Sequence, residues 1–261
     1  MLAQPDLSKL SVGQFAARFR GEMIPLSNTF SYFCASVPLS EEDLKEYLEE
    51  PIAALPPAIA ALLPKVSIML VPYLEKGDGK EKGDERGDEF VCTEKPPENR
   101  LSWATQVRFD KEEVLVFALK DQDVSEYHYR FYHILATLAG DLWSEEAQSQ
   151  YFTLLREELR AGVHGEVDEE SWQVKQGLLR RQSNIRKETK LFRDYARQSF
   201  IDTLTLYLHG ICCDIDVDTG PRQLPSRHLR KRLNLLYKLF PPPEGYAVFP
   251  EHQAPEEQSK G

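Results

Sequence analysis

Hydrophobic and polar positions alternate over residues 103–109, and a continuous apolar run covers residues 114–119. The polar turn Asp110-Lys111-Glu112 separates the two runs. Alternation is typical of a half-buried strand, whereas a short unbroken apolar run indicates a strand that is covered on both faces. The pattern therefore predicts an antiparallel β-hairpin whose second strand lies inside a sheet.

Two further strands are predicted before this hairpin. Residues 66–73 are apolar at both odd and even positions, which indicates a second strand covered on both faces. Residues 90–93 form a shorter apolar run, and the charged, glycine-containing stretch 75–89 between the two is predicted to be a loop. The sheet is thus expected to contain about four strands, mainly antiparallel.

The chain is predicted to be helical on both sides of this sheet. Apolar positions recur with helical spacing from residue 124 to residue 240, and residues 1–64 also contain amphipathic segments, one of them with Ser40 as its N-cap. The prediction is an α+β fold with a small sheet packed against a helical C-terminal half. The fold is expected to form a single globular domain over residues 1–250, followed by a disordered polar tail at residues 251–261.

Composition narrows the class of protein. With 261 residues, 41% hydrophobic and 28% charged, the chain is typical of a globular protein. No apolar run reaches the roughly 20 residues that a membrane span needs, and the first residues do not resemble a signal peptide, so a cytoplasmic protein without membrane contact is expected. A net charge of −10 disfavours general binding to nucleic acid.

The sequence predicts no cofactor and no metal site. The four cysteines, Cys34, Cys92, Cys212 and Cys213, include no CxxC pair and are interpreted as reduced thiols. His209, near the end of a long helix, is expected to interact with the terminal carbonyl groups of that helix.

The helix that follows the hairpin contains the pentapeptide His133-Ile134-Leu135-Ala136-Thr137, and a later helix contains Gln198-Ser199-Phe200-Ile201-Asp202. This order of elements resembles the core of the zincin metallopeptidases, in which an HExxH helix follows the sheet. In the gluzincin branch, a later helix supplies the third zinc ligand in the pattern Glu, three residues, Asp.

The resemblance implies a degenerate site. His133 matches the first zinc ligand, but Ile134 replaces the catalytic Glu and Thr137 replaces the second His. Gln198 replaces the third ligand, and Asp202 matches the carboxylate that supports the ligands. One imidazole with a Gln and a Thr cannot hold zinc tightly, and an isoleucine cannot act as a base. No catalytic residue is therefore assigned. The alternative is that His133 belongs to a solvated polar stripe with Glu126, Arg130 and Thr137.

Two stretches of the chain are rich in Lys and Arg, although the net charge of the whole chain is negative. They form a candidate basic surface that would bind nucleic acid or an acidic protein. The favoured interpretation is a solvated helix face, because nearby aromatic residues (Phe192, Tyr195, Phe200 and Tyr207) are spaced for core packing. The surface comprises Arg180, Arg181, Arg186, Lys187, Lys190, Arg227, Arg230, Lys231 and Arg232.

Three hypotheses about function follow. The preferred one is a non-catalytic, zincin-like protein that acts by binding another protein, whose identity the sequence does not give. The second is a hydrolase with an atypical site around Glu126, His133 and Asp202. The third is a regulatory protein that docks nucleic acid through its basic C-terminal helices.

Overall fold

The computed structural model describes residues 10–77, 89–180, 188–213 and 222–249. The chain divides into two compact units. The sheet unit comprises Met1–Glu49 and Leu63–Arg130, and the helical unit comprises Glu50–Leu62 and Phe131–Gly261. The α+β class predicted from the sequence is confirmed. A single domain over residues 1–250 stays a prediction, and the tail at 251–261 lies outside the described residues.

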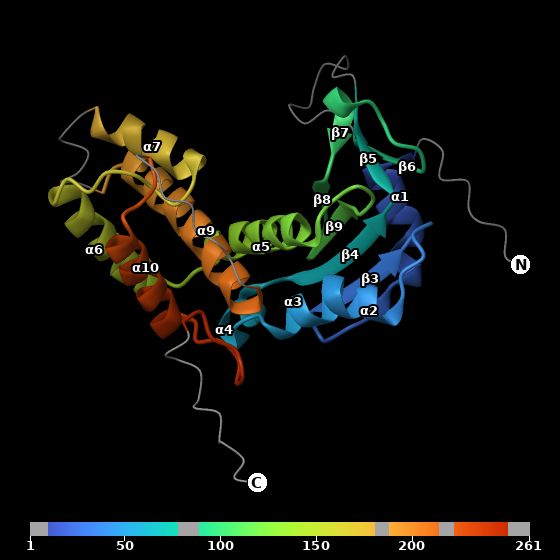
Figure 1. Ribbon diagram of the computed structural model, residues 1–261, viewed down its shortest axis with the longest axis horizontal. Coiled ribbons are helices and arrows are strands. Elements are labelled where there is room, and N and C mark those ends of the chain that lie inside the picture. Colours follow the sequence, from blue (N-terminus) through green and yellow to red (C-terminus); the bar gives the residue numbers. More distant parts are fainter. Residues whose placement is uncertain (1–9, 78–88, 181–187, 214–221, 250–261) are drawn as a thin grey trace, which may run out of the picture. The chain divides into compact units, whose positions relative to one another are not determined.

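The sheet unit contains a mixed five-stranded sheet, whose neighbouring strands are, in order, β2 (Ile24–Pro25), β3 (Phe30–Cys34), β4 (Lys65–Val71), β9 (Glu112–Ala118) and β8 (Ala104–Phe109) (Figure 1). β4 pairs in parallel with β3 and β9, and the two outer pairs are antiparallel. Six of the seven residues of β4 and of β9 are buried. The prediction that these two strands are covered on both faces is therefore confirmed.

A second sheet consists of four short antiparallel strands, which are, in order, β1 (Leu10–Ser11), β6 (Glu89–Cys92), β5 (Tyr73–Lys76) and β7 (Leu101–Ser102). The chain passes from the first sheet to the second at Pro72, between β4 and β5. Proline has no N–H to donate to a ladder, so Pro72 continues the pairing of β4 only through its carbonyl oxygen, which accepts from the N–H of Lys120 at 3.2 Å.

Helix α1 (Val12–Phe19) provides the apolar cover for one face of the larger sheet. Ser11 and Gln14 form a capping box at its start, in which each backbone N–H donates to the other side chain at 3.2–3.3 Å. The alternating side chains of the predicted hairpin, Trp103, Val107 and Phe109, pack against the same cluster, whose buried members include Val12, Phe15, Ala16, Phe19, Met69, Val71, Val114, Val116 and Ala118.

The N-terminal region differs from its prediction. Residues 1–64 are not entirely helical, because the described part includes β1, β2 and β3. The helices of this region are α2 (Glu41–Leu44), η2 (Lys45–Glu49), α3 (Glu50–Ala53) and α4 (Pro57–Leu62), together with α1 and the short η1 (Arg20–Glu22). Ser40 caps α2 as predicted. The described residues thus form nine strands instead of about four, although most pairings are antiparallel as expected.

The C-terminal half is helical, as predicted. Its helices are α5 (Val124–Gly140), which begins in the sheet unit, α6 (Glu145–Arg160), α7 (Glu169–Leu179), α9 (Lys190–Cys212) and α10 (Ser226–Leu239). Helices α6, α7 and α10 all contact α9 (Figure 1). None of the helices in the described ranges combines the length and apolar character needed to cross a membrane.

Four charged side chains are buried in the helical unit, each with no more than 2% of its surface exposed. Arg232 of α10 donates from Nη1 to Glu166 Oε2 and from Nη2 to Glu158 Oε2, both at 2.6 Å. Lys175 of α7 donates from Nζ to Glu166 Oε1 at 2.9 Å. Two cations thus neutralise two carboxylates, a balance that buried charges require because desolvation costs several kcal/mol per ion. We call these four residues the buried ion network.

Backbone pairing holds Glu166 in place. Its N–H donates to Arg222 O, and its carbonyl accepts from the N–H of Leu224, both at 2.9 Å. Gly165 has a positive φ of +78°, and a Cβ atom there would lie 2.1 Å from the carbonyl oxygen of Gln223. Only glycine permits this close approach.

The network also sets the protonation of Glu166. Burial alone would raise the pKa of this carboxyl, but the charges of Arg232 and Lys175 and a hydrogen bond from Tyr195 lower it to about 2. Because the pKa in the folded state lies below its ordinary value of 4.5, the network stabilises the fold above about pH 4.5, and this contribution is lost as the pH falls towards 2.

We expect Arg232→Met to destabilise the protein by about 3–5 kcal/mol, because two buried carboxylates lose their main cation. Lys231→Met is the matched control: the neighbouring side chain is exposed, so the change should stay within about 0.5 kcal/mol. Urea unfolding followed by circular dichroism measures both. An Arg232→Met protein as stable as the control would contradict the role given to the network.

Candidate functional sites

The residues predicted on α5 make contacts that stabilise helices. His133 and Thr137 are half-buried, and Thr137 Oγ1 donates to His133 O at 2.9 Å within the helix. Nδ1 of His133 lies 3.5 Å from Oγ1 of Thr205, on α9. Glu126 is exposed and forms an ion pair with Arg130 at 3.0 Å. His133 therefore faces a neighbouring helix.

Gln198 and Asp202, one turn apart on α9, are brought together as the sequence pattern predicts. Gln198 Nε2 donates to Asp202 Oδ1 at 2.8 Å and to Glu170 Oε2 at 3.0 Å. Asp202 Oδ2 accepts from the backbone N–H of Ser171, the third residue of α7, at 3.2 Å. The first N–H groups of a helix have no partner within it, so Asp202 supplies a cap to α7 from another helix.

Burial raises the pKa of Asp202 to about 6, and the charge of Asp168 adds to the rise, while the hydrogen bonds from Ser171 and Gln198 oppose it. Raised carboxyl pKa values occur at catalytic sites. Here both carboxylate oxygens accept hydrogen bonds from the protein itself, which fits a structural cap.

Only part of the predicted basic surface is exposed to solvent. Arg180, Lys190, Arg227, Arg230 and Lys231 are exposed. Arg232 is fully buried in the ion network, so its assignment to the surface is wrong. Its true environment follows from helix geometry, because it shares a face with Leu229, Leu233 and Leu236. Arg181, Arg186 and Lys187 lie outside the described residues.

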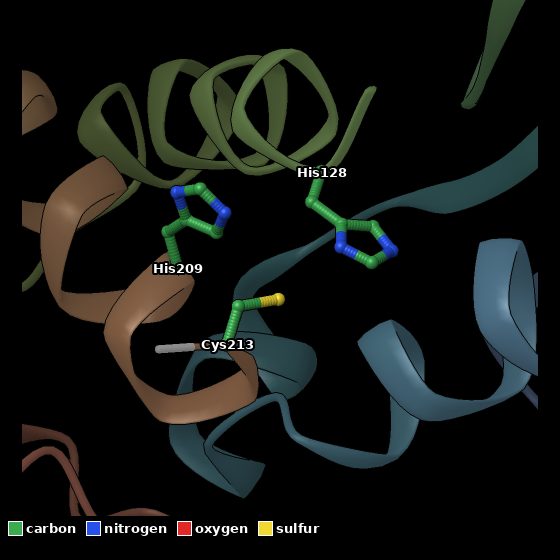
Figure 2. Close-up of side chains that lie close together, drawn as sticks. All are labelled: His128, His209 and Cys213. Atoms are coloured by element: carbon green, nitrogen blue, oxygen red, sulfur yellow. The ribbon is translucent and has the colours of Figure 1, made fainter. Parts of the chain in front are cut away.

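A different pair of side chains has the composition of a metal site. His209 of α9 and Cys213, the C-cap of α9, have ligand atoms within 4.8 Å of one another (Figure 2). Sequence reasoning missed this pair, although the i, i+4 spacing of the two residues brings them close together at the end of a helix.

The four cysteines are free thiols in the structure, and all four are half-buried. Hydrogen bonds from Cys213 and Tyr132 lower the pKa of the Cys212 thiol, against the opposing effects of burial and of Glu50.

No protein-family model, no curated protein and no solved structure matches the chain. Its function therefore has to be inferred from the chemistry of the side chains described above.

We expect Asp202→Asn to stabilise the protein by roughly 2 kcal/mol above about pH 6, and to have little effect below pH 3.8. The raised pKa means that ionisation of Asp202 costs stability as the pH rises through this window, and an amide removes that cost while its oxygen still accepts from Ser171. Urea unfolding at several pH values measures the effect.

Asp202→Ala is the control for the cap. Because alanine offers Ser171 no acceptor, this variant should be about 1 kcal/mol less stable than Asp202→Asn across the same pH range. If Asp202→Asn were instead less stable than the parent above pH 6, the negative charge itself would be required at this position.

Proposed function

We propose that the chain is a non-catalytic, zincin-like protein that binds an acidic segment of a partner protein through the exposed face of α10. The observation that supports this proposal is the composition of that face. Arg227, Lys231 and Lys238 follow one another at helical spacing and are exposed, with Arg230 beside them, and α10 contains no Asp or Glu.

The position of these cations supports a binding role. Arg227 lies in the first turn of α10, at the positive end of the helix dipole, where a cation is disfavoured by about 0.3–1 kcal/mol. Together with Arg230 and Lys231 it forms a local positive face on a chain of net charge −10. A carboxylate-rich partner would offset this repulsion and would be steered to the face over the acidic background.

Nucleic acid is the alternative ligand for a basic face. Single-stranded nucleic acid is usually held by exposed aromatic rings among the cations. Phe192, Tyr195, Phe200 and Tyr207 have no exposed surface, in agreement with the prediction that they pack in the core. These rings offer no stacking platform, so an acidic protein segment is the favoured ligand.

The non-catalytic part of the proposal is supported by the roles of the candidate site residues. Ile134 cannot replace a general base, and Asp202 is engaged in capping α7. The zincin-like part depends on the order of elements, in which the β8–β9 hairpin leads into α5 and α9 follows later. Metal analysis of the purified protein tests both: a bound zinc ion that is lost in His133→Ala would overturn the non-catalytic assignment.

The binding surface is tested with a fluorescent peptide of alternating Asp and Ser, measured by anisotropy at physiological salt. We expect the double variant Arg227→Glu/Lys231→Glu to weaken binding roughly tenfold or more, because two attractive charges become repulsive. The control, Lys111→Glu/Arg193→Glu, makes the same change in net charge at two exposed positions outside α10 and should keep most of the affinity.

Equal losses in the two double variants would show that only net charge matters and would contradict a specific face on α10. Tighter binding of a single-stranded or duplex oligonucleotide than of the acidic peptide, with a steep salt dependence, would favour the nucleic-acid hypothesis instead.

A further inference from the structure

The end of α9 carries chemistry that the acidic-partner proposal does not use. His209 and Cys213 lie one helical turn apart, and the backbone N–H of Cys213 donates to His209 O at 2.9 Å. This hydrogen bond continues the pattern of the helix to its C-cap, so the backbone of Cys213 is held one turn beyond His209. In Figure 2 both leave the helix towards the same space.

We propose that this end of α9 binds one transition-metal ion of the Zn²⁺ class, with the imidazole of His209 and the thiolate of Cys213 as ligands. Imidazole and thiolate are the donors that zinc prefers, and a mixed nitrogen and sulfur set disfavours the hard ions Mg²⁺ and Ca²⁺. An i, i+4 spacing of two ligands is a recurrent way of presenting zinc donors, and here the second ligand is the residue that directly follows the helix.

The distances fit after a small adjustment. Tetrahedral zinc with ordinary Zn–N and Zn–S bond lengths places its ligand atoms about 3.5 Å apart. The ligand atoms of His209 and Cys213 lie at most 4.8 Å apart. A rotation about the Cα–Cβ bond of Cys213, which is half-buried and stands just after the helix, is the kind of movement that would close this difference.

The local electrostatics also favour a cation. The C-terminal end of a helix carries a partial negative charge of roughly half an electron. His209 has only 8% of its surface exposed, so an ion held there is partly removed from water, and its attraction to the thiolate and the helix end is strengthened.

Cys212 is the candidate for the third ligand. It precedes Cys213 directly, and its thiol is hydrogen-bonded to that of Cys213.

The test is a titration of reduced, metal-free, full-length protein with Zn²⁺ against a chromophoric chelator. We expect one zinc ion per chain. His209→Ala and Cys213→Ser should each weaken the affinity by more than about tenfold, since even the loss of a group that only supports a ligand commonly costs that much. Matched controls are His164→Ala and Cys92→Ser, which remove an imidazole and a thiol elsewhere and should keep the parent affinity.

Co²⁺ identifies the ligand atoms. A thiolate-to-cobalt charge-transfer band in the parent protein, lost in Cys213→Ser and kept in Cys92→Ser, would support the site. If Cys212 supplies the third ligand, Cys212→Ser also weakens zinc binding. Serine is nearly isosteric with cysteine, so Cys213→Ser is expected to fold, which circular dichroism checks. The test therefore remains valid even if His209→Ala unfolds.

Zinc binding that is absent, or equal in Cys213→Ser and the controls, would overturn the proposal. A zinc ion lost in His133→Ala but kept in Cys213→Ser would overturn it as well, and would count against the non-catalytic assignment. Peptide binding at α10 involves other residues, so the two proposals can fail separately.

Discussion

The guanidinium of Arg232 is the group on which the packing of the helical unit depends. It joins α10 to Glu158 of α6 and to Glu166, which Lys175 of α7 also neutralises. Apolar side chains can still pack after small shifts of a helix. A shift that separates a buried carboxylate from its cation, in contrast, leaves an unpaired buried charge and is strongly destabilising. The network thus restricts how α6, α7 and α10 can sit around α9, and the apolar residues of these helices pack within that restriction.

Much of the fold could be predicted because its signals are local. The β8–β9 hairpin, the buried strand β4 and the Ser40 cap of α2 each depend on neighbours in sequence. Strand β3 was missed for the opposite reason. Its register, from Phe30 opposite Val66 to Cys34 opposite Leu70, joins segments 36 residues apart, and nothing near Phe30–Cys34 encodes such a partner. Two-residue strands such as β1 and β2 exist only through the strands they pair with.

In the candidate sites, too, local signals could be recognised in the sequence, whereas partners that are distant in sequence could not. The i, i+4 pair of Gln198 and Asp202 was recognised, and the two side chains do meet, but the partner that explains Asp202 is the start of α7, which no pattern within α9 reveals. Arg232 was placed on the surface because its neighbours are basic, although its helical phase with Leu229 and Leu236 points inwards. His209 and Cys213 were examined as separate residue types, so their common face was overlooked. For Arg232, helical phase was more informative than the charge of its neighbours.

The chain order of the buried ion network has a consequence for synthesis. Glu158, Glu166 and Lys175 leave the ribosome before α10, which brings the arginine that the two carboxylates require. Until Ser226–Leu239 has emerged, α6, α7 and α9 cannot close without trapping an excess negative charge, so the nascent helical unit must remain open and hydrated there. A chain interrupted before α10 would therefore lose more than one helix: it would expose an incompletely packed helical surface to chaperones and proteases.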